Sequence, residues 1–526
     1  MQSGAQDRSG PVVKQRALFT KNGPGMLVRR RTELYFALVV AVYLLFHFHY
    51  GRFEATDELF FKAPGKNWAE TGRFNAPELT WSFGREALPV QVDEIFFMQP
   101  PLYPFLFGVF VKLFGFGWRQ CVMYDAVIHA GLMLTTFLLT KGLVNSVFSS
   151  GTKVLRPWLC IVPALMIMPL GQAGRPDELA MTLGMIGLLL LLRGQSLARV
   201  IASAIFFGMS AGTSAGAAIE LGLVAAGLML FRNTSVRVKV RNILSWAVSC
   251  VFVLSLVLSP ILIKYPAAYR QYLLLAQKYL FQLSPTALDF ALQFGKPYFL
   301  LIAAALAVAT CGLLSNVRLF RDRGLSALWI GTMAAVIFAL CALPGKYTYL
   351  WFVLPVLIAT AFVSALYIVR QSGHNGFRLI VEAIALFSLS AYAWAARDAL
   401  LLIGLDDEQR PAYNERRLRE IIPEGSAVIV HKGWWFLGDR ATSYDSMFSS
   451  KADLTDIDYI ILSATGSGRP GVPRLPANPR YKALLLEQFE EVYNNLSPEP
   501  NKILGVTLSR SGNGFGVIVY KRSSGA

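Results

Sequence analysis

The stretch LYFALVVAVYLLFHFHY at residues 34–50, preceded by Arg29, Arg30 and Arg31, decides the fold class of this chain. It has about the length of an apolar helix that crosses a hydrocarbon core of about 30 Å. No small-residue cleavage site follows it, so we expect a retained membrane anchor and not a signal peptide that is removed. The three arginines predict that the basic tail, residues 1–32, lies in the cytoplasm.

Similar apolar stretches recur as far as residue 403. Of the 526 residues, 54% are hydrophobic, and the mean hydropathy of +0.45 exceeds what one water-soluble core could bury. We therefore predict an α-helical polytopic membrane protein with about eleven transmembrane helices. The predicted spans are 33–50, 120–145, 156–171, 176–193, 199–213, 215–231, 241–263, 297–314, 325–343, 348–369 and 378–403.

The net charge of +17 comes largely from short basic clusters in alternate connections between these spans. Such clusters are typical of cytoplasmic loops, so they argue against nucleic-acid binding and for a cytoplasmic N-terminus. The other connections are then extracytoplasmic, as is the segment that follows an odd number of spans. The compact form and the lack of a visible organelle signal favour a bacterial inner membrane.

The first outer loop, residues 51–119, is long enough to be folded and functional. Within it, residues 100–115 are apolar but short and include Lys112. If residues 100–115 crossed the membrane, the next basic loops would lie on the outer side. We therefore predict an interfacial helix over 100–115 that lies along the outer surface.

The C-terminal segment, residues 404–526, changes from continuous apolar runs to mixed patterns. Amphipathic periodicity predicts helices, and short runs rich in Val, Ile and aromatic residues predict strands. We expect a small extracytoplasmic α/β domain that binds rather than catalyses. Its predicted elements are helices over 407–422 and 481–494 and strands over 426–431, 458–463 and 515–521.

Ionisable residues gather at the predicted outer ends of the spans, where they are costly enough to be functional candidates. We expect a cavity that opens outward at the membrane surface. Carboxylates and cations together suit an attack by a hydroxyl or amine on a sugar carbon while a lipid phosphate departs. The residues concerned are Asp57, Glu58, Asp93, Glu94, Asp125, Arg175, Asp177, Glu178, Glu220, Lys264 and Lys346.

Five motifs occur in a set order between residues 33 and 370. They are Asp57-Glu58 after the first span, AETGRF at 69–74, QPPLYP at 99–104, GRPDELA at 174–180 and KYTY at 346–349. Together they resemble the C-type glycosyltransferases that use polyprenyl-phosphate sugars, of the protein O-mannosyltransferase and lipid A aminoarabinose transferase type.

The resemblance implies a transmembrane glycosyltransferase domain over 33–403, a dolichyl- or undecaprenyl-type phosphate sugar as donor, and inversion at the anomeric carbon. It also implies a catalytic acidic residue in the first outer loop. Asp57 matches that position, and its neighbour Glu58 is the second catalytic candidate. The acceptor could be a glycan, a lipid or a protein, and the sequence does not decide between them.

Substrate-binding candidates follow from the same resemblance. Arg175 could bind the donor phosphate while Asp177 orients it, and a local salt bridge is the simpler interpretation of this pair. Lys346 matches a basic residue of the family, with Tyr347 beside it and Tyr103 in the Pro-Pro helix.

Two further acidic residues, Asp93 and Glu94, precede that helix. Relatives in the aminoarabinose branch carry an acidic and a basic residue directly before the prolines, where this chain has Met98 and Gln99. Asp93 or Glu94 could orient the acceptor or hold a divalent cation, and a surface role for the pair is the alternative. We assign no metal and no other cofactor.

A multispan transporter or flippase of a lipid-linked or polar substrate is the alternative function. Transporters tend to place polar groups near the bilayer midplane, on broken helices in repeated halves. Here the polar groups lie at one rim and no internal repeat is apparent. The pattern therefore favours an enzyme over a transporter, and over a membrane scaffold that presents the C-terminal segment.

Overall fold

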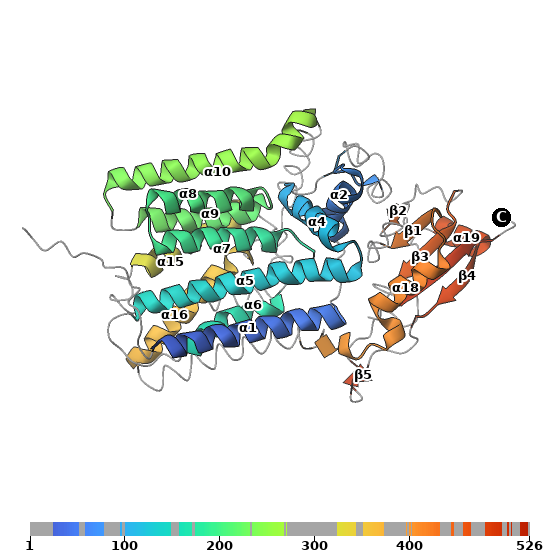
Figure 1. Ribbon diagram of the computed structural model, residues 1–526, viewed down its shortest axis with the longest axis horizontal. Helices are drawn as coiled ribbons and strands as arrows, with labels where there is room; N and C mark the ends of the chain where they lie inside the picture. The colour runs from blue at the N-terminus through green and yellow to red at the C-terminus, as the bar shows by residue number, and fades with distance from the viewer. Residues whose placement is uncertain are drawn as a thin grey trace, which may run out of the picture.

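The structure is a computed structural model in which a bundle of helices lies at one end and a small sheet at the other (Figure 1). All structural statements below refer to the residues that it describes. These are 25–51, 58–77, 95–96, 100–148, 157–170, 174–231, 234–267, 270, 323–342, 351–372, 396, 399–400, 402–431, 443–445, 456–463, 479–496, 502–503, 506–507 and 516–523.

The bundle helices lie side by side and agree with most of the predicted spans (Figure 1). Three segments are long and apolar enough to cross a membrane: Arg31–Tyr50, Trp118–Val147 and Val236–Lys264. The predicted spans 297–314 and, apart from a few residues, 378–403 lie outside the described residues. The bundle helices are α1 (Gly25–Tyr50), α5 (Trp118–Val147), α7 (Asp177–Arg193), α8 (Leu197–Ala211), α9 (Ala215–Leu230), α10 (Val236–Lys264), α15 (Arg323–Ala342) and α16 (Leu354–Ser372).

The span predicted over 156–171 is wrong as one continuous helix. The chain forms a 3-10 turn η2 (Pro157–Ile161), a short helix α6 (Val162–Ile167) and a second turn η3 (Met168–Leu170). Proline lacks a backbone N–H and clashes with the carbonyl four residues earlier. Pro163 is therefore accommodated in the first turn of α6, and Pro169 lies just after its end.

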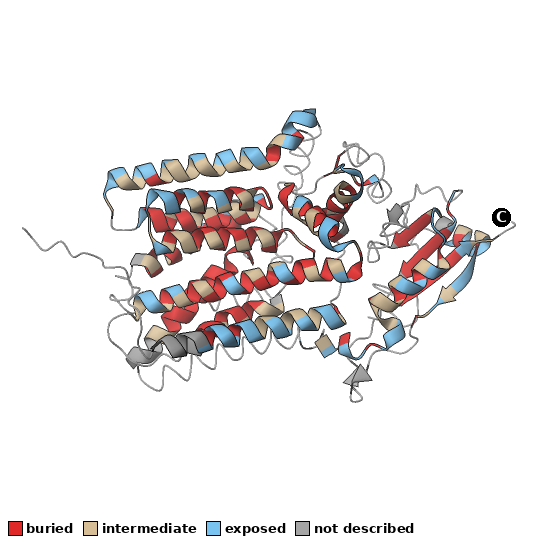
Figure 2. Ribbon diagram, viewed as in Figure 1, coloured by how far each residue is buried: buried red, intermediate tan, exposed pale blue. Residues whose placement is uncertain are grey.

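Helix α5 is central to the bundle, whereas α1 and α10 lie at its edge (Figure 2). Within the most apolar 18-residue stretch of each helix, 67% of the residues of α5 are buried, against 11% for α1 and 6% for α10. The core is formed by apolar side chains from α5, α7, α9, α15 and α16. The exposed apolar surface of α1 and α10 suits contact with lipid, whose tails are as apolar as these side chains.

The two ends of the bundle are chemically different. At one end Lys141 of α5 pairs with Glu33 of α1 at 2.6 Å, next to the basic clusters. At the other end the amide of Leu102 donates to the carbonyl of Gly212 at 3.0 Å, in the turn between α8 and α9. Connections that carry basic clusters thus lie at one end and the remaining connections at the other, as the sequence predicted. Which end faces the cytoplasm stays a prediction.

Two packed helices cover the end of the bundle that carries Gly212 (Figure 1). They are α2 (Glu58–Thr71) and α4 (Leu102–Phe114). Helix α4 confirms that 100–115 is largely helical, while its interfacial position stays a prediction. The two helices cross at Gly65 and Gly108. A Cβ on Gly65 would lie 2.1 Å from the Pro104 carbonyl oxygen, so only glycine permits this approach.

A five-stranded sheet follows in the C-terminal segment, in the order β2-β1-β3-β7-β4. Strand β1 is parallel to β2 and β3, and β7 is antiparallel to β3 and β4. Alternate residues point to opposite faces. Val430 and Val519 join a cluster with α4, α5 and α18, and Ile429 and Ile518 join one with α19. The elements are η5 (Asp407–Gln409), α18 (Pro411–Ile421), β1 (Val428–His431), β2 (Ser443–Asp445), β3 (Tyr459–Ser463), α19 (Pro479–Gln488), β4 (Phe489–Asn494), β5 (Lys502–Ile503), β6 (Val506–Thr507) and β7 (Val517–Arg522).

The helix predicted over 481–494 is wrong in its second half. Helix α19 ends at Gln488, and Phe489–Asn494 forms strand β4, which pairs with β7. The sequence FEEVYN holds β-branched and aromatic residues as well as helix-forming glutamates. Pairing with β7 overrides the local helical preference.

Candidate active site

A buried lysine organises the start of α2. Lys62 has no exposed surface, and its Nζ forms ion pairs with Glu58, one turn earlier, and with Asp125 of α5 at 2.5 Å. Glu58 and Asp125 are 2% and 4% exposed. Because a buried charge is costly unless it is paired and hydrogen-bonded, these contacts hold α2 against α5 in one arrangement.

Tyr103 of α4 completes this group. Its hydroxyl donates to Oδ1 of Asp125 at 2.9 Å, and the Tyr124 hydroxyl donates to the Tyr103 carbonyl at 3.3 Å. Burial, and then the nearby Asp125 carboxylate, raise the pKa of Tyr103 well above its ordinary value. The phenol therefore stays neutral and remains a donor. Asp125 is held by a cation from α2 and a hydroxyl from α4.

The corner before α7 packs against Glu58. Gly174 has a φ of +68°, and a Cβ at this position would lie 2.5 Å from the Glu58 Cβ, so glycine is required. Nε of Arg175 donates to Oδ2 of Asp177 at 3.0 Å, and the Ser214 hydroxyl donates to Oδ1 at 2.9 Å. Asp177 is buried, whereas the Arg175 side chain is 34% exposed. A partly accessible guanidinium thus lies beside the start of α2.

A second buried pair lies one turn further along α5 and at the start of α7. Nδ1 of His129 is 3.2 Å from Oε2 of Glu178, and Nε2 is 3.2 Å from the Met168 carbonyl oxygen. His129 follows Asp125 by four residues, so the two share one face of α5. Polar contacts therefore continue from the end of the bundle into its interior.

The structure brings together the catalytic and substrate-binding candidates that it describes. Glu58, Tyr103, Arg175 and Asp177 all lie at the α4 end of the bundle, linked through Asp125 and Gly174. The other catalytic and substrate-binding candidates lie outside the described part of the chain: Asp57, Asp93, Glu94, Lys346 and Tyr347. Two further ionisable residues expected at the outer rim are described but do not belong to this cluster: Glu220 is buried in α9, and Lys264 ends α10, where its Nζ lies over the Tyr265 ring at 5.2 Å.

Two residues of the cluster were missed from the sequence. Lys62 follows Glu58 by four residues, and His129 follows Asp125 by four, which is the spacing of neighbours on one helix face. That spacing is the signal that could have found them, once a helix was expected to begin at residue 58. Asp125 was recognised only as an ionisable residue at the outer end of a span.

Within the described ranges, no group of three or more His, Cys, Asp or Glu side chains could hold a metal ion. The cation ligands considered from the sequence, Asp93 and Glu94, fall outside those ranges. The arrangement around Lys62 is instead one of ion pairs and hydrogen bonds among protein groups.

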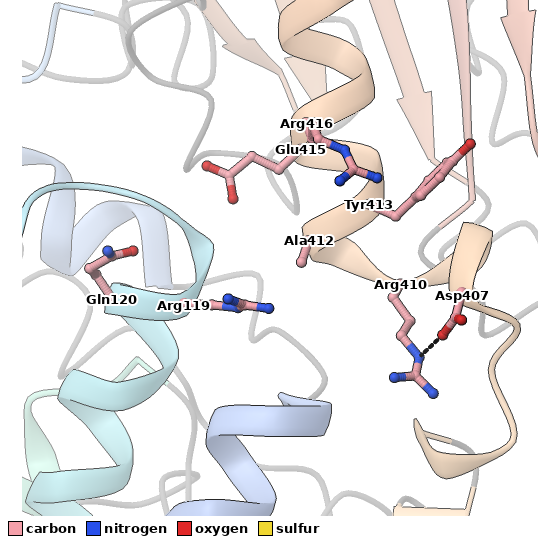
Figure 3. A pocket seen from close by; sticks show the side chains of 8 residues that line it. All are labelled: Arg119, Gln120, Asp407, Arg410, Ala412, Tyr413, Glu415 and Arg416. Atoms are coloured by element: carbon pink, nitrogen blue, oxygen red, sulfur yellow. Dashed lines mark ion pairs between the residues drawn. The ribbon is translucent and has the colours of Figure 1, made fainter.

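A hollow of about 540 Å³ lies beside this cluster, between the start of α5 and α18 (Figure 3). It is more basic than acidic, and Glu58, Tyr103 and Asp177 do not line it. Its lining residues are Arg119, Gln120, Asp407, Arg410, Ala412, Tyr413, Glu415 and Arg416.

Two solved structures share the arrangement of this chain. ArnT from Cupriavidus metallidurans, bound to undecaprenyl phosphate, matches with a TM-score of 0.56 over 93% of this chain and 98% of ArnT, at 13% sequence identity. The arabinofuranosyltransferase AftD from Mycobacteria matches with a TM-score of 0.50 over 93% of this chain and 40% of AftD, at 14% identity. No protein-family model and no curated protein matches the sequence.

The chain shares the fold of these two solved structures. This confirms the fold that the ordered motifs implied. Because both identities are low, the likeness extends to the arrangement of the chain and not to individual residues. In this fold, the Lys62 cluster lies where α2, α4, α5 and the corner before α7 meet.

Proposed function

We propose that this protein is a membrane glycosyltransferase that moves a sugar from a polyprenyl-phosphate donor to an acceptor hydroxyl or amine. The reaction takes place at the extracytoplasmic surface and inverts the anomeric carbon. The observation that carries this proposal is the fold match to ArnT, a protein solved with undecaprenyl phosphate, over 93% of this chain.

The charged groups at the α4 end support the proposal. Carboxylates and cations from helices distant in sequence meet there. The proposed reaction needs both kinds of group in one site, a carboxylate for the proton and a cation for the leaving phosphate. In this proposal Arg175, oriented by Asp177, binds the donor phosphate together with Lys346 and Tyr347. Tyr103 holds Asp125 at the border of the substrate site.

Asp57 is the proposed general base. Its carboxylate takes the proton from the acceptor hydroxyl or amine, whose oxygen or nitrogen attacks the anomeric carbon opposite the phosphate. The bond from that carbon to the phosphate oxygen breaks, and polyprenyl phosphate leaves with the electron pair. Glu58, joined to Asp57 by one peptide bond, is tied to Lys62 and so is better suited to position the base than to exchange protons.

The remaining acidic candidates, Asp93 and Glu94, are assigned to the acceptor. Carboxylates can accept hydrogen bonds from sugar hydroxyls or attract an amine. A divalent cation held by these two residues is an extension of the same proposal, tested by adding a chelator to the transfer assay.

The test is sugar transfer by the wild type and by Asp57→Asn in proteoliposomes, with labelled polyprenyl-phosphate sugar and a panel of acceptors. Loss of a general base should lower kcat by about 10²–10⁴-fold while the KM for the donor changes little. The asparagine keeps the size of the side chain, so folding should be preserved.

Glu70→Gln is the matched control. Glu70 lies near the end of α2 with 42% of its side chain exposed, so the substitution removes the same charge away from the cluster. It should transfer sugar at the wild-type rate. A full rate in Asp57→Asn would remove Asp57 as the base.

A further inference from the structure

Three arginines face the hollow between α5 and α18, and two of them have no acidic partner among the described residues. Arg119 projects from the start of α5, and Arg410 and Arg416 come from the other wall (Figure 3). The Cζ of Arg119 lies over the Phe48 ring at 5.7 Å, and that of Arg416 over the Tyr413 ring at 5.6 Å. A guanidinium group that contacts an aromatic ring through its flat face can still donate hydrogen bonds from the N–H groups in its own plane.

Both acidic residues of the hollow already have basic partners. Glu415 pairs with Arg419 at 3.2 Å and accepts from the Trp118 amide at 3.4 Å. Asp407 is within 3.3 Å of Nε of Arg410, but its side chain is 89% exposed and this ion pair is weak in water. The hollow therefore has an excess of positive charge that suits an anion.

The same hollow lies at the end of an exposed apolar surface. One face of α1 exposes Leu34, Leu38, Val42, Leu45 and Phe48, at the three- and four-residue spacing of a single helical stripe. Phe48, the last of them, is the ring that Arg119 covers. An acyl chain along this stripe would bring its headgroup to the hollow.

We propose that Arg119, Arg410 and Arg416 bind the phosphate of an anionic membrane phospholipid whose acyl chains lie along the exposed stripe of α1. Guanidinium groups match phosphate oxygens with paired hydrogen bonds. Arg410 also stacks on Tyr50 at the end of α1, at 5.6 Å. Bound lipid would join α18 to the ends of α1 and α5.

This site is separate from the proposed catalytic cluster. Arg119 precedes Asp125 by six residues, which is about 9 Å along a helix and on a different face. Arg119 is exposed, whereas Asp125 is 4% exposed. Lipid binding here is therefore independent of whether the protein transfers sugar.

The experiment compares lipid retention by the full chain in nanodiscs of phosphatidylcholine mixed with phosphatidylglycerol. After detergent extraction, native mass spectrometry gives the ratio of the two lipids that remain bound. The wild type should retain phosphatidylglycerol preferentially. The double variant Arg119→Gln/Arg416→Gln should reduce this preference by about tenfold or more, because it removes two charge-assisted contacts.

Arg417→Gln is the matched control, since Arg417 lies on α18, is exposed and pairs with Glu420 outside the hollow. It should keep the wild-type preference. An equal preference in the wild type and the double variant would overturn the proposal. Both substituted arginines are exposed, and gel filtration verifies that the variants fold.

A second arm uses inorganic phosphate as the probe and separates a lipid from a soluble anion. With phosphatidylcholine alone, phosphate should raise the melting temperature of the protein much less than phosphatidylglycerol does, because phosphate lacks the chains that contact α1. Equal stabilisation by free phosphate, with no preference for phosphatidylglycerol, would overturn the lipid assignment.

Discussion

Lys62 shows how one residue can determine the geometry of this site. Lys62 has no exposed surface and is stabilised by Glu58 and Asp125, and its charge stabilises both buried carboxylates in turn. The ammonium also lies over the ring of Phe107 at 5.3 Å. The start of α2 is therefore tied to α5 of the bundle.

We expect Lys62→Met to destabilise the protein by about 3–5 kcal/mol, since it leaves two buried carboxylates without their cation. The measurement is thermal unfolding of the purified protein in detergent. Adding Glu58→Gln and Asp125→Asn to Lys62→Met should restore much of the stability, because no unpaired charge remains.

Lys66→Met is the control for this prediction, one turn further along α2. Lys66 pairs at 3.2 Å with Glu70, whose side chain is 42% exposed, so water replaces the lost partner. Lys66→Met should therefore lower the stability clearly less than Lys62→Met does. Equal losses for the two lysine variants would show that the buried ion pairs are not what holds α2.

At the scale of elements, the crossing of α2 and α4 brings two backbones into contact. A Cβ on Gly108 would lie 2.5 Å from the Gly65 carbonyl oxygen, and backbone atoms cannot move aside as a flexible side chain can. Tyr103 projects from the same α4 to Asp125. The crossing therefore sets the distance between the hydroxyl and the carboxylate.

Gly108→Ala should separate the two helices, lower stability by about 1–3 kcal/mol and reduce sugar transfer. Unfolding in detergent and transfer in proteoliposomes measure the two effects. Gly142→Ala is the matched control, because Gly142 lies in α5 with nothing within 4 Å of an added Cβ. That change should leave activity unaltered and stabilise the helix by about 0.5–1 kcal/mol. Wild-type stability in Gly108→Ala would contradict the tight crossing.

At the scale of the whole molecule, the two ends of the bundle have different partners. One end carries the basic turns, where Gln195 donates to the Leu228 carbonyl at 2.9 Å and Asn242 donates to the Gln195 carbonyl at 3.3 Å. The other end carries the packed helices α2 and α4 and the sheet (Figure 1). Basic turns prefer the cytoplasm, which predicts that the site and the sheet lie outside.

Single cysteines test this orientation in intact cells with a thiol reagent that does not cross membranes. Glu424→Cys, at an exposed position after α18, should be labelled without permeabilisation. Arg237→Cys, at the exposed start of α10, should be labelled only after permeabilisation. The reverse result would place the Lys62 cluster on the cytoplasmic side and contradict the proposed reaction.

The sequence predicted most of the helices well, because apolar length and basic connections are local properties. Its two errors have the same physical origin. Prolines at 163 and 169 interrupted one apolar run, and pairing with β7 converted the second half of a predicted helix into β4. Both depend on backbone hydrogen bonds, which hydrophobic periodicity does not report.

The sequence by itself determined that this is a multispan membrane protein with its candidate site residues near one end and its basic connections near the other, because the transfer of side chains into lipid depends on composition and order alone. Only the tertiary structure decided which of those residues meet. Lys62 and Asp125 are 63 positions apart, and Glu58 contacts the corner at Gly174. Such pairs form when packed helices bring distant segments together, so neither spacing nor charge in the linear chain identifies them.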